Sequence, residues 1–110
     1  MYIPDRGDVV WLSFDPHVGR EQAGRRPAVV LSPQTYNGKV GLAICCPVTN
    51  QAKGYPFEVP IPAGEKVTGV ILADQVRSLD WKGRQAEFVT RLAVDQLNEV
   101  LDRIEAVLRD

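Results

Sequence analysis

The chain has 110 residues, of which 45% are apolar and 25% charged, and its formal net charge is −1. This length suits one domain over residues 1–110 with a single hydrophobic core, and the composition is ordinary for a soluble globular protein. A charge near zero argues against a general nucleic-acid coat protein, which is usually strongly basic. No apolar run approaches the roughly 20 residues of a membrane span, and residues 1–6 hold no apolar secretory region. We therefore expect a cytoplasmic protein with no membrane segment.

The first elements along the chain are typical of a β-hairpin with a long loop. A strand-like run over residues 9–14 ends at Asp15-Pro16. Residues 19–26 are polar and charged and include two glycines, so we expect a loop whose backbone can approach a ligand closely. Residues 27–31 are mostly an unbroken apolar run and predict a buried strand. The loop would place a carboxylate, an amide and three guanidinium groups at the end of a rigid core strand.

The middle of the chain is predicted to hold a short helical turn and several strands. Ser32-Pro33 resembles a helix N-cap followed by proline, which favours one turn through Tyr36, and Asn37-Gly38 is a turn signal. Strands are expected over residues 40–48, 57–61, 67–76 and 81–89. The strand at 57–61 contains and adjoins prolines, which cannot donate ladder hydrogen bonds, so we expect it at a sheet edge.

The end of the chain predicts an amphipathic helix near residues 94–108. Apolar residues recur there at helical spacing, namely Leu97, Val100, Leu101, Ile104, Val107 and Leu108. Many short strands and one terminal helix indicate a mainly β fold of the α+β type. We expect a strongly bent antiparallel sheet or small barrel with helices on its outside.

The two cysteines, Cys45 and Cys46, are neighbours in an apolar run. Adjacent strand residues point to opposite faces, so the two thiols cannot easily bridge each other. We interpret both as small core or half-buried residues in a reducing compartment. The one histidine, His17, stands far from them in sequence and is interpreted as a surface or substrate-edge residue. Because no metal-ligand spacing is present, we expect neither a metal nor another cofactor.

The polar residues beside the predicted strand ends suit cleavage of RNA by its own 2′-hydroxyl. That reaction needs a group to take the 2′ proton, positive charge on the phosphorane and a proton for the leaving 5′ oxygen. Glu21 is the candidate base and Arg26 the candidate phosphate clamp, while the hydroxyl of Thr49 could orient a phosphate oxygen. No metal is required, because the nucleophile belongs to the substrate.

Five motifs, in order, resemble the MazF/PemK family of toxin–antitoxin endoribonucleases over nearly the whole chain. They are GDVVW at 7–11, GREQAGRRPAVVL at 19–31, PVTNQ at 47–51, KGYPFEV at 53–59 and LADQVRS at 72–78. The resemblance implies a homodimeric, SH3-like (CcdB-like) antiparallel β-barrel that cuts single-stranded RNA (mRNA) at short sequences without metal. The products would carry a 2′,3′-cyclic phosphate or 3′-phosphate and a 5′-hydroxyl. A cognate antitoxin would silence the enzyme with an extended tail laid across the RNA channel.

The resemblance also assigns roles to single residues. The family's principal catalytic arginine and threonine fall on Arg26 and Thr49, and a glutamate that supports activity in some members falls on Glu21. We further predict that RNA contacts come from Gln22, Arg25, Gln51, Lys53 and Tyr55. The two glutamines would read base edges or bond the loop backbone, and Lys53 and Tyr55 would attract phosphate and stack on a base.

Structural alternatives remain for these residues. Arg26 could form an ion pair with Glu21 or Asp15, Thr49 could cap a turn, and Tyr55 could pack at the edge strand. Two other functions also fit the architecture. One is a poison that binds DNA gyrase and has no nuclease site, and the other is an RNA-binding module without cleavage.

Overall fold

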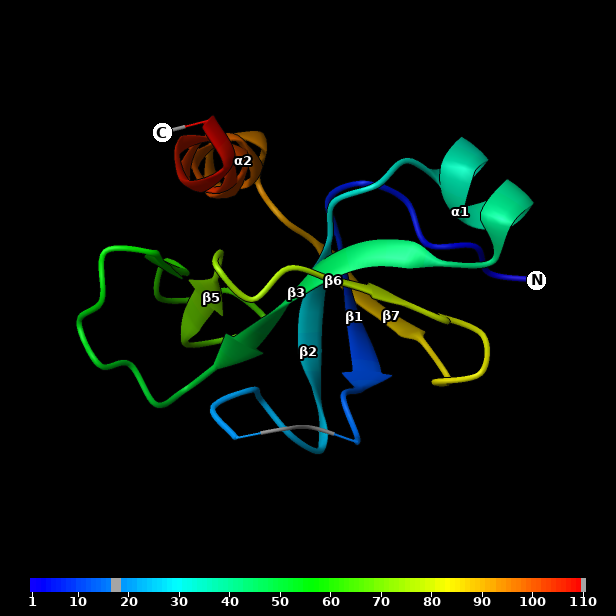
Figure 1. The fold of residues 1–110 in the computed structure, drawn as a ribbon, viewed down its shortest axis with the longest axis horizontal. Coiled ribbons are helices and arrows are strands. Elements are labelled where there is room, and N and C mark those ends of the chain that lie inside the picture. Colours follow the sequence, from blue (N-terminus) through cyan, green and yellow to red (C-terminus); the bar gives the residue numbers. More distant parts are fainter. Residues whose placement is uncertain (17–18, 110) are drawn as a thin grey trace.

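The computed structural model describes residues 1–16 and 19–109 and shows an antiparallel sheet with two helices (Figure 1). The strands are β1 (Asp8–Ser13), β2 (Arg25–Val30), β3 (Ala43–Thr49), β4 (Glu58–Pro60), β5 (Val70–Leu72), β6 (Arg77–Leu79) and β7 (Glu87–Arg91). The helices are α1 (Gln34–Val40) and α2 (Val94–Arg109). The mainly β fold with a C-terminal amphipathic helix is therefore confirmed. His17 lies outside the described residues, so its place at the surface stays a prediction.

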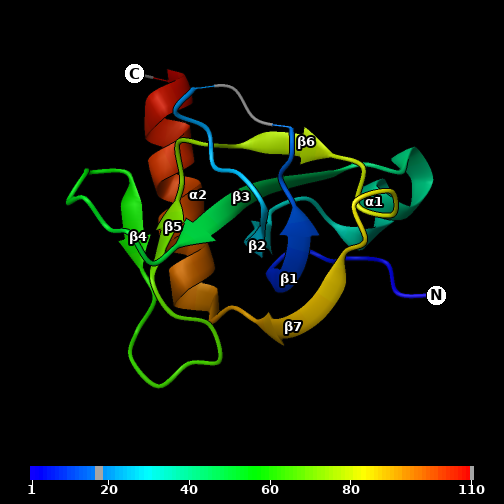
Figure 2. The ribbon, with the colours of Figure 1, turned by 90° about the horizontal axis from the view of Figure 1, so that it is seen from below.

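The sheet is organised around β3, and its order is β4-β5-β3-β2-β1-β7. β3 pairs with β6 through its first residues and with β5 through its last, where Thr49 lies opposite Val70. Figure 2 shows β3 crossing the molecule between these two partners. β1 and β2 form the expected hairpin, and β4 lies at the predicted sheet edge. This topology brings the end of β3 beside the long β1–β2 connection.

Hydrophobic residues fill both faces of the sheet. Val9 and Cys46 belong to one core cluster, which α2 covers with Leu97, Leu101 and Ile104. Val10 and Cys45 belong to a second cluster on the other face, with Phe14 and Trp81. The two neighbouring thiols thus point to opposite faces and both are buried, as predicted. Burial raises the pKa of the Cys45 thiol to about 12, and burial also raises the pKa of the Cys46 thiol.

The prediction of a turn at Asn37-Gly38 is wrong, because both residues lie inside α1. Asn37 is fully buried, and its amide nitrogen donates to the backbone oxygens of Pro4 (2.8 Å) and Ser32 (2.9 Å). The Ser32 hydroxyl donates to the Asn37 amide oxygen (2.5 Å) and does not cap the helix, whose N-cap is Pro33. These hydrogen bonds outweigh the local preference of Asn-Gly for a turn, so the helix continues through both residues. The helix ends at Val40, and its C-cap Gly41 adopts the left-handed conformation with φ 83°.

Other predicted boundaries also moved. The strand expected at 40–48 begins at Ala43, because α1 continues through Val40. The strand expected at 67–76 is β5 followed by a turn, in which the Gln75 N–H donates to the Leu72 oxygen (3.1 Å). The chain must bend there, since β5 and β6 pair with opposite ends of β3. The last expected strand, at 81–89, is shifted to Glu87–Arg91 by a turn that precedes it.

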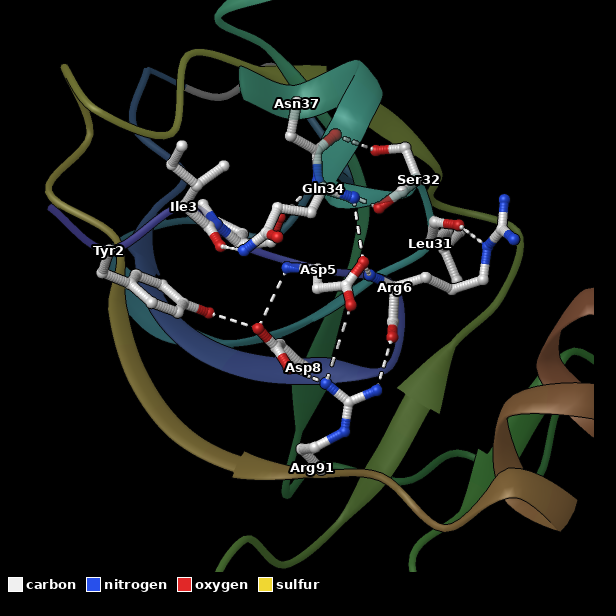
Figure 3. A network of polar contacts seen from close by, with 11 residues as sticks. Tyr2, Ile3, Asp5, Arg6, Asp8, Leu31, Ser32, Gln34, Asn37 and Arg91 are labelled. Carbon is white, nitrogen blue, oxygen red and sulfur yellow. Dashed lines mark hydrogen bonds and ion pairs between the residues drawn. The ribbon is translucent and has the colours of Figure 1, made fainter. Parts of the chain in front are cut away.

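A polar network centred on the buried Asp8 carboxylate joins the N-terminal segment to the sheet and α1 (Figure 3). The Asp8 carboxylate accepts hydrogen bonds from the Tyr2 hydroxyl (2.6 Å), the Asp5 N–H (3.0 Å) and the Arg91 guanidinium (2.7 Å). The Asp5 carboxylate accepts from the Gln34 N–H at the start of α1 (2.9 Å), which lowers the pKa of Asp5. Burial raises the pKa of Tyr2, and its bond to Asp8 raises it further. The network is a structural unit distinct from the groove described next.

Candidate functional site

A groove of about 700 Å³ lies between the β1–β2 connection and the segments that follow β3 and β5. Its lining residues are Arg20, Glu21, Gln22, Thr49, Gln51, Lys53, Tyr55, Glu58, Leu72, Asp74 and Gln75. Six of these were predicted as site residues: Glu21, Gln22, Thr49, Gln51, Lys53 and Tyr55. Segments that are far apart in sequence therefore meet at one surface, because the sheet topology places the end of β3 beside the hairpin loop.

Arg26 lies at the start of β2, not in the loop as expected, since that strand begins at Arg25. Its Nε and Nη2 atoms both donate to the Ala23 oxygen (3.0 and 2.8 Å), and its Nη1 donates to the Val48 oxygen (3.3 Å). The guanidinium thus joins the loop to the residue that precedes Thr49. A guanidinium has five N–H groups. The bonds found for Arg26 within the described residues use three of them and leave two, although Arg26 is not among the residues that line the groove.

Thr49 is the last residue of β3 and is largely buried, with 7% of its surface exposed. Its hydroxyl oxygen accepts a hydrogen bond from the Gln51 N–H (3.1 Å), which leaves the hydroxyl proton for another partner. Gly69 packs closely against the same residue. A Cβ at Gly69 would lie 2.2 Å from the backbone oxygen of Thr49, and the φ of Gly69, +112°, also favours glycine. Gly69 therefore packs directly against the backbone of Thr49.

Two backbone N–H groups of the β1–β2 connection, those of Gln22 and Gly24, donate hydrogen bonds to side chains. The Gln22 N–H donates to the Gln75 side-chain oxygen (3.2 Å), and the Gly24 N–H donates to the Asp15 carboxylate (2.9 Å). Glu21, which lines the groove, directly precedes the anchored Gln22. The Gly24 N–H is thus one partner of the Asp15 carboxylate. On the sequence alone, Asp15 was a possible ion-pair partner of Arg26.

Sequence reasoning assigned no site role to five lining residues: Arg20, Glu58, Leu72, Asp74 and Gln75. Arg20 had been counted only among the three guanidinium groups of the loop at 19–26. Asp74 and Gln75 lie in the motif at 72–78 that matches the family, so the motif itself was the available signal. Glu58 lies in the motif at 53–59, which likewise matches the family, but it was interpreted only as a polar residue of the predicted edge strand.

Arg25 occupies a different position from the other predicted RNA contacts. Its Nη2 atom donates to the Glu87 carboxylate (2.8 Å) and the Gln85 oxygen (2.7 Å), and it does not line the groove. In this structure, Arg25 therefore ties the hairpin to the segment before β7. A contact between Arg25 and RNA stays a prediction.

The groove combines cations, carboxylates, amides, a hydroxyl and an exposed aromatic ring. Arg20 and Lys53 can attract a phosphate backbone, while the 60% exposed ring of Tyr55 can stack on a planar group. Amide and carboxylate groups can bond the edges of bases. The chemistry fits a flexible anionic chain that carries planar polar groups. Within the described residues, none of the helices is long and apolar enough to cross a membrane.

Comparison with known proteins agrees with this chemistry. The model of the family described as PemK-like, MazF-like toxin of type II toxin-antitoxin system matches residues 5–108. The endoribonuclease toxin MazF of Escherichia coli (strain K12) is 49% identical over 107 residues, covering 97% of this chain and 96% of that protein. The crystal structure of MazF (Form-I) from Deinococcus radiodurans has a TM-score of 0.95 at 55% identity and covers 98% of each chain. The MazF of the MazE-MazF complex (Form-II) from the same organism has a TM-score of 0.88 at 50% identity, covering 99% of this chain and 98% of that one.

The match spans almost the whole chain in the family model, in the relative and in the solved structures, and it includes every segment that lines the groove. The chain belongs to the family of PemK-like, MazF-like toxins of type II toxin-antitoxin systems.

Proposed function

We propose that this protein is the toxin of a type II toxin–antitoxin pair and cleaves single-stranded mRNA at a short sequence without a metal ion. The observation that carries the proposal is the groove, into which the β1–β2 connection brings Glu21 and Gln22 and the end of β3 brings Thr49 and Gln51. Its relatives of nearly equal length are endoribonucleases. A poison without a nuclease site would not need this set of side chains at one surface.

The 2′ oxygen of the substrate attacks the adjacent phosphorus, and the bond from phosphorus to the 5′ oxygen breaks. One proton leaves the 2′-hydroxyl and a water molecule supplies the proton that reaches the 5′ oxygen, so the products are a 2′,3′-cyclic phosphate and a 5′-hydroxyl. Hydrolysis of the cyclic phosphate gives a 3′-phosphate. Glu21 accepts the 2′ proton, while Arg26 and Thr49 bind the phosphate oxygens on which negative charge develops.

The bonds around Arg26 support this assignment. Its guanidinium is held between the Ala23 and Val48 oxygens, so little side-chain entropy remains to be lost when a phosphate binds. Thr49 follows Val48 directly and its backbone is closely packed by Gly69. A preorganised donor set of this kind stabilises a transition state better than mobile side chains do.

The partners follow from the same assignment. The MazE-MazF complex from Deinococcus radiodurans, in which the MazF chain is 50% identical to this one, is a toxin bound to its antitoxin. We propose that a cognate antitoxin binds this protein and blocks the groove, and that the active form is a homodimer. The site of action is the cytoplasm, where the mRNA substrate lies.

The test is incubation of the purified protein with a long, mixed-sequence single-stranded RNA in EDTA, followed by mapping of the new ends. We expect discrete cuts at one short motif with 5′-hydroxyl ends, and loss of these cuts in Arg26→Ala. Intact RNA after incubation with folded, antitoxin-free protein would contradict the proposal. Inhibition of DNA gyrase by that protein would then favour the protein-binding poison, and RNA binding without cleavage would favour a binding module.

A further inference from the structure

We propose that Glu58 is a positioning residue for RNA binding, whose carboxylate holds the loop that carries Lys53 and Tyr55. This inference rests on the proposed ribonuclease function. Glu58 lines the groove together with Thr49, so its carboxylate is at first sight a second candidate for proton transfer. Its contacts indicate a different role.

The Glu58 carboxylate is bonded to two successive backbone N–H groups of the loop. One oxygen accepts from the Lys53 N–H (2.9 Å) and the other from the Gly54 N–H (2.9 Å), with a longer contact from Lys53 to the latter oxygen (3.2 Å). The Glu58 N–H also donates to the backbone oxygen of Tyr55 (3.1 Å). A single residue at the start of β4 therefore closes the turn over residues 53–58 with its side chain and its backbone.

The loop that Glu58 closes is exposed and has few other supports. Residues 50–56 are all exposed, and Tyr55 has 60% of its surface exposed. Its far end is tied to α2, where Arg103 donates to the Pro56 oxygen and pairs with Glu99 (3.0 Å). Lys53 is thus bonded at the first support, and Tyr55 lies between the bonded residues Gly54 and Pro56. Without the Glu58 carboxylate, RNA binding would have to order this part of the loop and would be weaker.

The direction in which RNA affinity changes when Glu58 is replaced distinguishes a loop anchor from a merely repulsive charge. A carboxylate in a groove that binds a polyanion repels phosphate, so removing its charge alone strengthens RNA binding. Loss of a loop anchor weakens binding instead. Loss of a catalytic base lowers kcat with little change in KM. The three roles therefore predict three different kinetic outcomes for one substitution.

The experiment measures kcat and KM of Glu58→Gln and Glu58→Ala on a single-stranded RNA oligonucleotide that contains the sequence cut by the unchanged protein. Amide hydrogen exchange of Lys53 and Gly54 is followed in the same variants. We expect KM to rise about tenfold in Glu58→Ala with kcat within about twofold, as loss of a charge-assisted bond predicts. We expect a smaller rise in Glu58→Gln, which keeps one acceptor, and faster exchange of both amides in each variant. Val59 keeps β4 in the core, so both variants should fold.

Two control variants separate charge from anchoring. Asp74→Asn removes a carboxylate from the same groove and should lower KM. Glu65→Gln removes an exposed carboxylate outside the groove and should leave both constants unchanged. A fall of KM in the Glu58 variants, a loss of kcat alone, or unchanged KM despite faster exchange would each overturn the inference. If the unchanged protein cuts no RNA, the proposed function fails, while unchanged exchange of Lys53 and Gly54 would separately refute the anchor.

Discussion

The N-terminal polar network and the groove are built from the same residue types, yet only the network is centred on a buried carboxylate. In the network, the Asp8 carboxylate is 3% exposed and is bonded to Tyr2, Asp5 and Arg91 (Figure 3). In the groove, Lys53 and Asp74 are exposed and face the space where a ligand would lie. The difference shows that a carboxylate or guanidinium stabilises the fold where its partners are internal. The same group becomes available for binding where the topology leaves it at a surface.

Arg26 combines both roles, and its substitution should have the largest effect. Arg26→Ala removes a preorganised phosphate donor, so we expect cleavage to fall about 10³-fold. It also removes bonds to the Ala23 and Val48 oxygens, so the free energy of unfolding should fall by about 1 kcal/mol. Single-turnover cleavage and thermal unfolding measure the two effects. Arg109→Ala, which removes an exposed cation paired with Glu105 on α2, is the control. Cleavage by Arg26→Ala within tenfold of the unchanged protein would contradict the assignment.

Substitution of Asp8 tests the network side of the comparison. Asp8→Ala leaves the Tyr2 hydroxyl and the Asp5 N–H without their acceptor, so we expect the free energy of unfolding to fall by about 3 kcal/mol. Because Asp8 does not line the groove, the folded fraction should cleave RNA at the normal rate. Denaturant unfolding and cleavage at low temperature check the two statements. A variant of normal stability that cleaves slowly would break the distinction between the two regions.

Thr49 tests the site again with a smaller change. Thr49→Val keeps the shape of the side chain and removes the hydroxyl, so we expect cleavage to fall about 10²-fold. The Gln51 N–H also loses its acceptor. Thr49→Ser restores the hydroxyl and should recover most of the cleavage rate, measured under single-turnover conditions. Equal rates for the Val and Ser variants would show that the hydroxyl has no part in the reaction.

Substitution of Cys45 in the core should have the smallest effect, which is a change in how the free energy of unfolding depends on pH above neutrality. The buried Cys45 thiol has its pKa raised to about 12, whereas an unfolded thiol titrates near 8.5. The unfolded state therefore loses its proton first as pH rises, and stability falls. The loss attributable to Cys45 should reach about 1 kcal/mol at pH 9. Between pH 7 and pH 9, the free energy of unfolding of Cys45→Ala should fall by about 1 kcal/mol less than that of the unchanged protein. An identical pH dependence of unfolding in the two proteins would refute this prediction.

Much of the fold follows from local pattern. The terminal helix, the first hairpin and the edge position of β4 are confirmed, because helical spacing, a long polar loop and prolines act over short distances. The turn at Asn37-Gly38 failed because Asn37 is bonded to Pro4, 33 residues away. The strand expected at 67–76 likewise stops at Leu72, because β5 and the following β6 pair with opposite ends of β3.

The candidate site divides in the same way. The family resemblance and the candidate residues Glu21, Arg26 and Thr49 could be predicted from motifs, because motifs are read along the chain without coordinates. Three contacts could not be predicted: the ion pair of Arg25 with Glu87, the bond from Arg26 to β3, and the bond from the Lys53 N–H to Glu58. Each of those outcomes depends on which backbone groups the folded sheet brings within hydrogen-bonding distance. Sequence spacing alone does not contain that information, because the partners come from separate elements.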